Sequence, residues 1–381
     1  MADESSSLSG DSCINGADTA WLLLCFVLVL QMFAGLALFE ASLLQAKNTV
    51  SVLVQVLVGL IALSVLWDLV GFTLVYGPTQ GGIIGGLDHA LLVDVPYDAC
   101  STFAPTVPAA AFAMFQMLFA AISPLLMTGA FAERLRFWPS LALTVFWEVL
   151  VYYPIAHWVW GGGWLSTQFG VKDFAGGIVI HTTAGAGSLV CAVILGPRHG
   201  FTEAGNEDPA PPSSLPTALL GCGLLFTGWF GFNAGSALSS GVLSTSAVVS
   251  TQIGACVSGL VWMVLSSACR PSHVEGEDRA AAAAARRRQG PSLMALMNGT
   301  IAGLAGITPA SGFIDSQASL VLGAVIGLCT FCTVGILKHR LGIDDALDVS
   351  SVHGVSGIVG SLGAYSSLNA SLYLATHLTV I

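Results

Sequence analysis

Long runs of apolar residues, separated by short polar segments, follow one another from about residue 20 to residue 364. Each run is long enough to cross the roughly 30 Å hydrocarbon core of a bilayer as a helix. The runs occupy residues 20–44, 50–77, 108–131, 137–158, 176–195, 215–233, 242–267, 292–310, 318–337 and 348–364. The pattern predicts an all-α polytopic membrane bundle of about ten transmembrane helices.

The composition supports this prediction. Of the 381 residues, 54% are hydrophobic and 9% are charged, whereas about 25% are charged in an average soluble domain. The formal charge of −10 comes from acids in the N-terminal segment and the loops, and no basic patch indicates a nucleic-acid partner. No nucleophile–base arrangement, metal cluster or phosphate loop indicates an enzyme, and no cofactor is expected.

The basic residues predict the direction of the helices. With the amino terminus outside, all of the 12 Lys and Arg residues except Lys172 fall in inner loops, as the positive-inside rule requires. Residues 1–19 are acidic and lack the basic region of a signal peptide, so we expect an extracellular tail.

Two halves of five helices each are expected, and because five is odd the second half enters the membrane from the opposite side. That is the geometry of an inverted repeat, in which sites form between the halves. The predicted segments are a first half at 20–199, an inner linker at 200–214, a second half at 215–364 with a low-complexity inner loop at 268–291, and a C-terminal remnant at 365–381.

One histidine lies in the last predicted helix of each half. Asp173 precedes His181 by eight residues, and Asp345 precedes His353 by the same distance. A single buried histidine is usually a core residue that is hydrogen-bonded to a carbonyl, but a matched pair of ionisable residues in a membrane favours a pathway. Neutral imidazoles donate at one nitrogen and accept at the other. The pair therefore favours passage of a small neutral molecule, since a charged one would lose hydration worth tens of kcal/mol.

Several long motifs, in order along the chain, resemble the ammonium transporter (Amt/Mep/Rh) family and in particular its Amt branch. They are FQMLFAAISPLLMTGAFAERLRF at 115–137, PIAHWVWGGG at 154–163, DFAGGIVIHTTAGAGSLVCAVILGPR at 173–198, GWFGFNAGSA at 228–237 and DDALDVSSVHGVSGIVG at 344–360. The resemblance implies a plasma-membrane homotrimer with one pore per subunit that takes up ammonium, and also methylammonium, for nitrogen supply. It implies that His181 and His353 line the pore.

The resemblance also assigns an outer vestibule and a gate. Trp160, Ser236 and Phe119 match the residues that receive ammonium, Asp173 matches an acid that supports that site, and Phe119 and Phe232 match two stacked rings that gate the pore. Independently, an aromatic face attracts a cation by about 0.5–2 kcal/mol, and a hydroxyl accepts an ammonium N–H. Taken one by one, the aromatic residues would be core or interfacial residues, Ser236 a packing hydroxyl, and Asp173 the cap of the following helix.

Some residues depart from the family pattern. Asp68 and Glu148 lie inside predicted helices where the family has apolar residues, so we expect them at the trimer interface, with proton coupling as the alternative. Ser350 and Ser351 precede His353 where the family commonly has a bulky aromatic and a small residue. The family usually has an eleventh helix, and residues 365–381 are too short and polar for one, which favours a truncated chain.

The nine cysteines give two further expectations. Cys329 and Cys332 form a C-x-x-C inside a predicted helix, where a buried packing pair is expected in place of a redox motif. Cys13 and Cys100 both fall on the predicted outer side, where a disulfide can form between them.

Two functions of other classes compete with transport. A receptor or sensor for ammonium with little flux would use the same binding site. A cation-coupled solute carrier would instead use Asp68 and Glu148.

Overall fold

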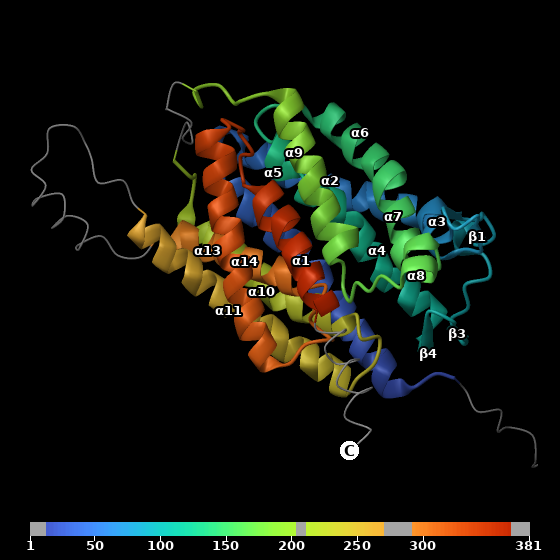
Figure 1. The fold of residues 1–381 in the computed structure, drawn as a ribbon. Coiled ribbons are helices and arrows are strands. Elements are labelled where there is room, and N and C mark those ends of the chain that lie inside the picture. The colour runs from blue at the N-terminus through green and yellow to red at the C-terminus, as the bar shows by residue number, and fades with distance from the viewer. Residues whose placement is uncertain (1–12, 203–210, 270–291, 367–381) are drawn as a thin grey trace, which may run out of the picture.

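The computed structural model describes residues 13–202, 211–269 and 292–366, which form a bundle of apolar helices (Figure 1). Among these residues, eight helices are long and apolar enough to cross a membrane. The eight are Gly16–Leu43, Ala46–Tyr76, Ala109–Phe131, Phe137–Phe169, Gly177–Leu195, Leu215–Gly235, Val242–Ala268 and Ser316–Arg340. The predicted all-α membrane bundle is confirmed. The helix predicted at 292–310 is present but shorter, at Leu293–Ile307, and residues 349–366 are helical where a helix was predicted at 348–364.

The helices are named in chain order. Before residue 200 they are α1 (Gly16–Leu43), α2 (Thr49–Leu66), α3 (Phe72–Tyr76), α4 (Ala109–Leu126), α5 (Thr128–Phe131), α6 (Phe137–Trp147), α7 (Tyr153–Val159), α8 (Trp164–Phe169) and α9 (Thr183–Leu195). After residue 200 they are α10 (Leu215–Gly235), α11 (Val242–Ala268), α13 (Leu293–Ile307) and α14 (Ser316–Gly335). Short 3₁₀ turns are η1 (Ala46–Asn48) and η3 (Ala90–Leu92).

Within the described ranges, five segments of π-helix interrupt the regular helices, which the apolar pattern did not predict. They are η2 (Trp67–Gly71), η4 (Glu148–Tyr152), η5 (Gly177–Thr182), η6 (Ile336–Arg340) and η7 (Ser350–Val355). An extra residue in one turn rotates the side chains that follow, and such turns often occur at functional sites. Both His181 and His353 lie in these segments.

Two small hairpins between α3 and α4 were also not predicted. Strand β1 (Thr79–Gln80) pairs antiparallel with β2 (Ile84–Gly85), and β3 (Cys100–Ser101) pairs antiparallel with β4 (Ala104–Pro108). The hairpins lie together beside α3 and α8 (Figure 1), and we call this the hairpin end of the bundle. The disulfide that the sequence left possible is present, since Cys13 is bonded to Cys100 of β3. It ties the start of α1 to the hairpins.

Small residues let the helices approach closely. Helices α1 and α10 pack along their lengths, and a Cβ at Gly221 would lie 2.5 Å from the backbone nitrogen of Phe39. A Cβ at Gly303 of α13 would lie 2.6 Å from the carbonyl oxygen of Gly254 in α11.

The expected pair at Cys329 and Cys332 is not part of this packing. Cys329 is half-buried and Cys332 is exposed on α14, so the expectation of a buried pair was wrong.

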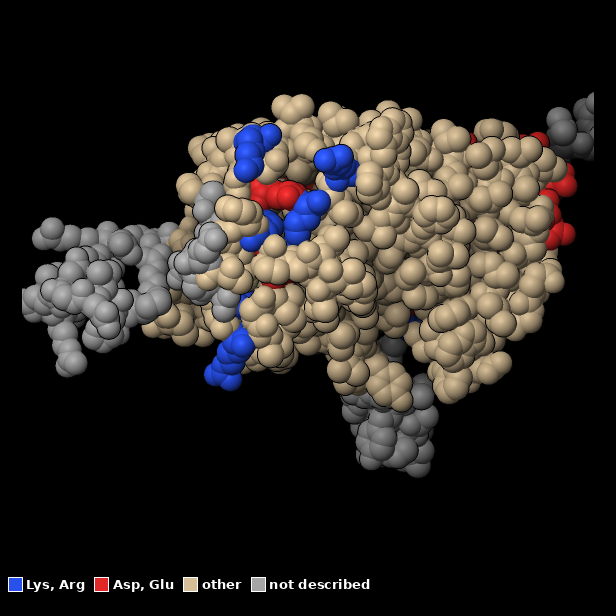
Figure 2. Space-filling view, turned by 90° about the horizontal axis from the view of Figure 1, so that it is seen from above, with Lys and Arg blue, Asp and Glu red and all other residues tan. Residues whose placement is uncertain are grey.

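Opposite the hairpin end, loop residues form a buried ion network. Arg198 contacts Asp344 at 2.8 Å and Glu133 at 3.1 Å, and all three side chains are at most 6% exposed. Glu133 also accepts hydrogen bonds from Gln45 and Asn48 in the turn between α1 and α2. The network therefore joins four separate loops. We call this the basic end, and Figure 2 shows blue Lys and Arg side chains gathered around a red carboxylate on this face.

The charge of Asp344 depends on Arg198. Burial by itself would raise the pKa of Asp344, but the hydrogen bonds and the charge of Arg198 outweigh it, so the pKa lies below its ordinary value. A carboxyl whose pKa is depressed on folding stabilises the fold above its unfolded pKa of about 3.9, and this contribution is lost as the pH falls further.

We expect Arg198→Met to destabilise the protein by about 3–5 kcal/mol, because it leaves two carboxylates buried without their cation. Thermal unfolding of the purified protein in detergent measures this. Arg340→Met is the matched control, since Arg340 is exposed and such changes usually stay within about 0.5 kcal/mol. Equal melting temperatures for the two variants near neutral pH would contradict the assignment.

Candidate functional site

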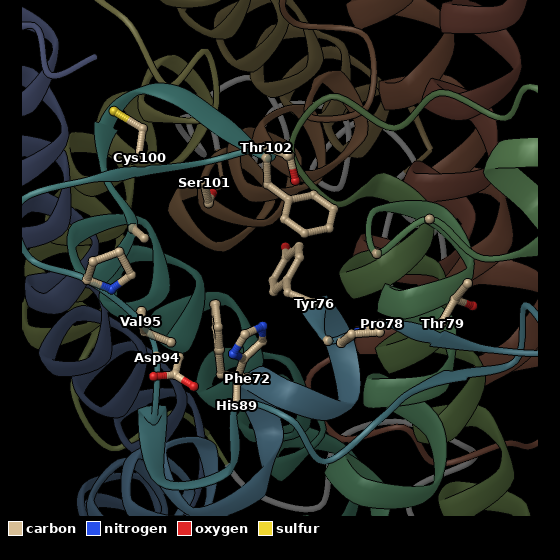
Figure 3. Close-up of a pocket in the computed structure, with 16 residues that line it drawn as sticks. Phe72, Tyr76, Pro78, Thr79, His89, Asp94, Val95, Cys100, Ser101 and Thr102 are labelled. Carbon is tan, nitrogen blue, oxygen red and sulfur yellow. The ribbon is translucent and has the colours of Figure 1, made fainter. Parts of the chain in front are cut away.

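Two cavities adjoin at the hairpin end. The larger has a volume of about 540 Å³ and is lined by the hairpin region, with Tyr76, Phe72 and His89 around its centre (Figure 3). The smaller has a volume of about 170 Å³ and shares Tyr76 and Phe103 with the larger one. The smaller cavity is lined by residues of α4 and by residues at the ends of α7 and α10, and we call it the vestibule.

The vestibule brings together the residues that the sequence placed there. Trp160, Ser236, Phe119 and Asp173 all line it. The Ser236 hydroxyl donates to the carbonyl of Phe232 at 2.8 Å, so the lone pairs of its oxygen remain to accept a hydrogen bond. The Trp160 indole N–H donates to the carbonyl of Asp173 at 2.9 Å, which fixes the ring at the wall of the vestibule.

Gln116 also lines the vestibule, and sequence reasoning missed it. Its side chain is 8% exposed, and its Oε1 atom has no hydrogen-bond partner in the described part of the chain. The signal in the sequence is the one polar residue between Ala109 and Ile122, three positions before Phe119 and therefore on the same face of α4. An unpaired amide oxygen is a second acceptor for an N–H donor.

Asp173 holds the turn that carries the first histidine. Its carboxylate accepts hydrogen bonds of 2.7–3.1 Å from the N–H groups of Gly176, Gly177, Ile178 and Val179. The expectation that Asp173 caps the following helix is confirmed. Burial raises the pKa of Asp173 above its ordinary value, although the four N–H groups act in the opposite direction. Gly176 has φ +115°, a conformation that favours glycine.

Beneath the vestibule, two phenylalanine rings separate it from the histidines. Phe119 and Phe232 stack with ring centroids 4.2 Å apart and planes inclined by 16°. Each ring is 1% exposed. The Phe232 ring also lies 6.1 Å from the His181 ring, so the rings form a continuous series from the vestibule to the histidines.

The two histidines face one another inside the bundle. Their Nδ1 atoms are 3.2 Å apart, and the residues are 1% and 6% exposed. Because the two atoms lie at hydrogen-bond distance, one Nδ1 carries a hydrogen and donates it in a hydrogen bond to the lone pair of the other Nδ1. The ring of Trp229 stacks on His181 with centroids 5.5 Å apart. Nε2 of His181 has no partner in the described part of the chain. The two imidazoles thus form a polar contact that is surrounded by apolar side chains.

The approach of the two histidine-bearing segments depends on Gly185. Helix α9 and segment η7 cross where a Cβ at Gly185 would lie 2.2 Å from Cα of Gly354. Such a distance is impossible without moving one backbone. Ser350, which precedes His353, donates to the Asp345 carboxylate through its N–H at 2.7 Å and its hydroxyl at 2.6 Å. A carboxylate therefore bonds to the turn of each histidine.

The two acids within helices have different surroundings. Asp68 is exposed on η2, whereas Glu148 of η4 is fully buried. The expectation that Glu148 lies at a subunit interface was wrong, because its side chain is enclosed within a single chain beside Tyr153. Because one side chain is exposed and the other is buried, the structure gives no support to a cation site shared by Asp68 and Glu148.

Comparison with known proteins places this chain in a family. The Ammonium Transporter Family matches residues 20–277 and 278–377. The chain belongs to the ammonium transporter family. Within this family, ammonium transporter 1 of Dictyostelium discoideum is 55% identical over 345 residues, which cover 91% of this chain and 70% of that protein. Ammonium transporter Amt1 of Archaeoglobus fulgidus is 36% identical over 349 residues, or 92% of this chain and 80% of that protein.

Solved structures of ammonium transporter family members share the fold. Saccharomyces cerevisiae Mep2 has a TM-score of 0.81 and 33% identity, covering 93% of this chain and 75% of that one. A protein named Sensor Amt Protein has a TM-score of 0.80 and 29% identity, covering 91% of this chain and 81% of that one.

We expect Gly185→Ala to lower stability by about 1–3 kcal/mol, because the added methyl overpacks the crossing with Gly354. Thermal unfolding in detergent measures the effect. Gly223→Ala on α10 is the control, since a Cβ there would meet nothing within 4 Å, and it should be neutral or stabilising by up to about 1 kcal/mol. If the two variants unfold alike, the glycine crossing is not the close contact described above.

Proposed function

We propose that this protein is a transporter or channel for ammonium, which it recruits in the vestibule and conducts as ammonia past His181 and His353. The observation that carries the proposal is the 3.2 Å contact between the Nδ1 atoms, directly beneath stacked rings and a cavity lined by hydrogen-bond acceptors. Membership of the ammonium transporter family supports the substrate.

The vestibule has the chemistry of a modest ammonium site. The face of Trp160 attracts a cation by about 0.5–2 kcal/mol. The oxygens of Ser236 and Gln116 accept ammonium N–H groups, because one has free lone pairs and the other has no partner. Methylammonium has the same charge and N–H groups, so we propose it as a second substrate. Weak binding allows release toward the pathway.

The passage below the vestibule selects against ions. A cation that enters the buried pathway loses hydration worth tens of kcal/mol, unless it gives up its charge. Ammonium can release a proton and cross as ammonia, which hydrogen-bonds to the imidazoles, whereas potassium cannot. Phe119 and Phe232 act as a gate, since their stacked rings close the route and must part for a molecule to pass.

The orientation and assembly are part of the proposal. We place the hairpin end and the amino terminus outside the plasma membrane. Lys47, Arg134 and Arg198 lie together at the other end, where the positive-inside rule predicts the cytoplasm. We further propose a homotrimer with one pathway in each subunit, built from two inverted halves at 20–199 and 215–364.

A second candidate function is ammonium sensing with little flux. It is favoured by the likeness to the structure named Sensor Amt Protein. Initial ammonium flux into vesicles that contain the purified protein, compared with binding to the same protein in detergent, separates the two functions. Binding without flux would favour the sensor.

We expect the double variant His181→Ala, His353→Ala to lose selective uptake. Without the imidazoles, the pathway offers ammonia no hydrogen-bonding groups, and no proton is shared between two ring nitrogens. Methylammonium uptake into vesicles, with potassium as the competing ion, measures selectivity. His339→Ala is the control, since His339 is exposed at the basic end. Unchanged uptake and unchanged rejection of potassium in the double variant would refute the proposed pathway.

A further inference from the structure

A small enclosed cavity lies next to His353 on the side of the basic end. Its volume is about 20 Å³, and its lining includes His353, Glu40 of α1 and Asn298 of α13 among apolar side chains. A cavity needs roughly 10–15 Å³ of this kind of volume to hold one water molecule. Ammonia is about the size of water, so the cavity has room for a single such molecule beside the imidazole. We call it the exit chamber.

Glu40 is an unusual group to find at such a place. Its side chain is 3% exposed, and the N–H of Gly129 is hydrogen-bonded to its carboxyl. Its other oxygen, Oε2, has no hydrogen-bond partner in the described residues. The apolar pattern of α1 did not single out this residue. A buried polar atom without a hydrogen-bond partner lowers the stability of the fold. Its presence here is therefore better explained by a function than by packing.

The charged groups around Glu40 come from the loop that precedes η7 and from the loop that follows α5. Asp345 is 2% exposed, lies within electrostatic range of Glu40 and has an unpartnered Oδ1. Arg134 lies near Asp345, but its guanidinium donates to the carbonyls of Ala130, Gly196 and Asp344. Neither residue is hydrogen-bonded to Oε2. An unpaired carboxylate at Glu40 would therefore cost much free energy, because it would be a buried charge without a counterion. A carboxylic acid, or a carboxylate beside a cation, would not carry this cost.

We propose that Glu40 is the proton donor that returns ammonia to ammonium in the exit chamber. The proposal rests on the proposed function and extends it to the inner end of the pathway. Ammonia leaves His353, and its lone pair takes the proton from the Glu40 carboxylic acid. The O–H bond breaks as the new N–H bond forms, which leaves a carboxylate beside an ammonium ion.

The other groups of the chamber fit this exchange. The side-chain oxygen of Asn298 can accept an ammonium N–H, and the carboxylate of Glu40 neutralises the new charge. Ammonium then departs to the solution at the basic end, and a proton from that solution restores the acid. The transfer is reversible, so the same residue takes a proton from ammonium that enters from inside.

The test measures initial ammonium flux into empty vesicles over a range of lumenal pH, for the population inserted with its basic end toward the lumen. For wild-type protein we expect the flux to fall as lumenal pH rises, because the acid form of Glu40 is needed. Glu40→Gln should be about a hundredfold slower, the low end of what a general acid contributes, and independent of lumenal pH. Glu40→Asp keeps the acid and should keep the pH dependence.

Glu148→Gln is the matched control. Glu148 is also a fully buried carboxyl within a helix, but it does not line the exit chamber, so its variant should keep the wild-type pH profile. The proposal is overturned if Glu40→Gln keeps that profile, whether the rate is unchanged or reduced, since a reduced rate alone indicates a structural role. Absence of flux in wild-type vesicles would instead refute the proposed function.

A second measurement needs no neutral variant and decides the matter if Glu40→Gln does not fold. Infrared difference spectra of the wild-type protein, recorded on exchange of potassium for ammonium, should show loss of a protonated carboxyl band and gain of carboxylate bands. Glu40→Asp should shift the lost band. No loss of such a band, or a loss that Glu40→Asp leaves unshifted, would overturn the proposal.

Discussion

The proposed pathway depends on one close approach between two backbones. Helix α9 and segment η7 meet at Gly185 and Gly354, with no space for a Cβ at Gly185. This approach is what allows the imidazoles of His181 and His353, on different parts of the chain, to come within 3.2 Å. A backbone shift of even about 1 Å would replace that hydrogen bond with two unpaired buried nitrogens, each costing about 1–3 kcal/mol.

The turns on either side of this crossing are held by carboxylates. Asp173 satisfies four N–H groups at the start of η5, and Asp345 bonds to Ser350 at the start of η7. Both turns are π-helical, and their irregular hydrogen bonding needs an outside acceptor if backbone donors are not to be left unpaired in an apolar interior. The equal spacing from each acid to its histidine therefore has a structural cause.

Polar groups follow one another along the bundle in an order that matches a cation that loses and regains its charge. Oxygen acceptors line the vestibule, stacked rings come next, then two imidazoles, and finally the buried acid Glu40. None of these groups needs to carry a lone charge in the dry part of the bundle, which would be the most expensive arrangement there. The buried charges of the basic end are paired with one another instead.

The sequence by itself determined the helices, the pairing of the two histidines and the capping role of Asp173, because apolar runs, regular spacing and an acid before a helix are local signals. It did not determine the hairpins after α3, whose strands are short, nor the unpaired oxygens of Gln116 and Glu40. It also could not separate exposed Asp68 from buried Glu148. Those outcomes depend on which face of a helix meets which neighbour, and when nearly every face is apolar, only the packing of the whole bundle decides that.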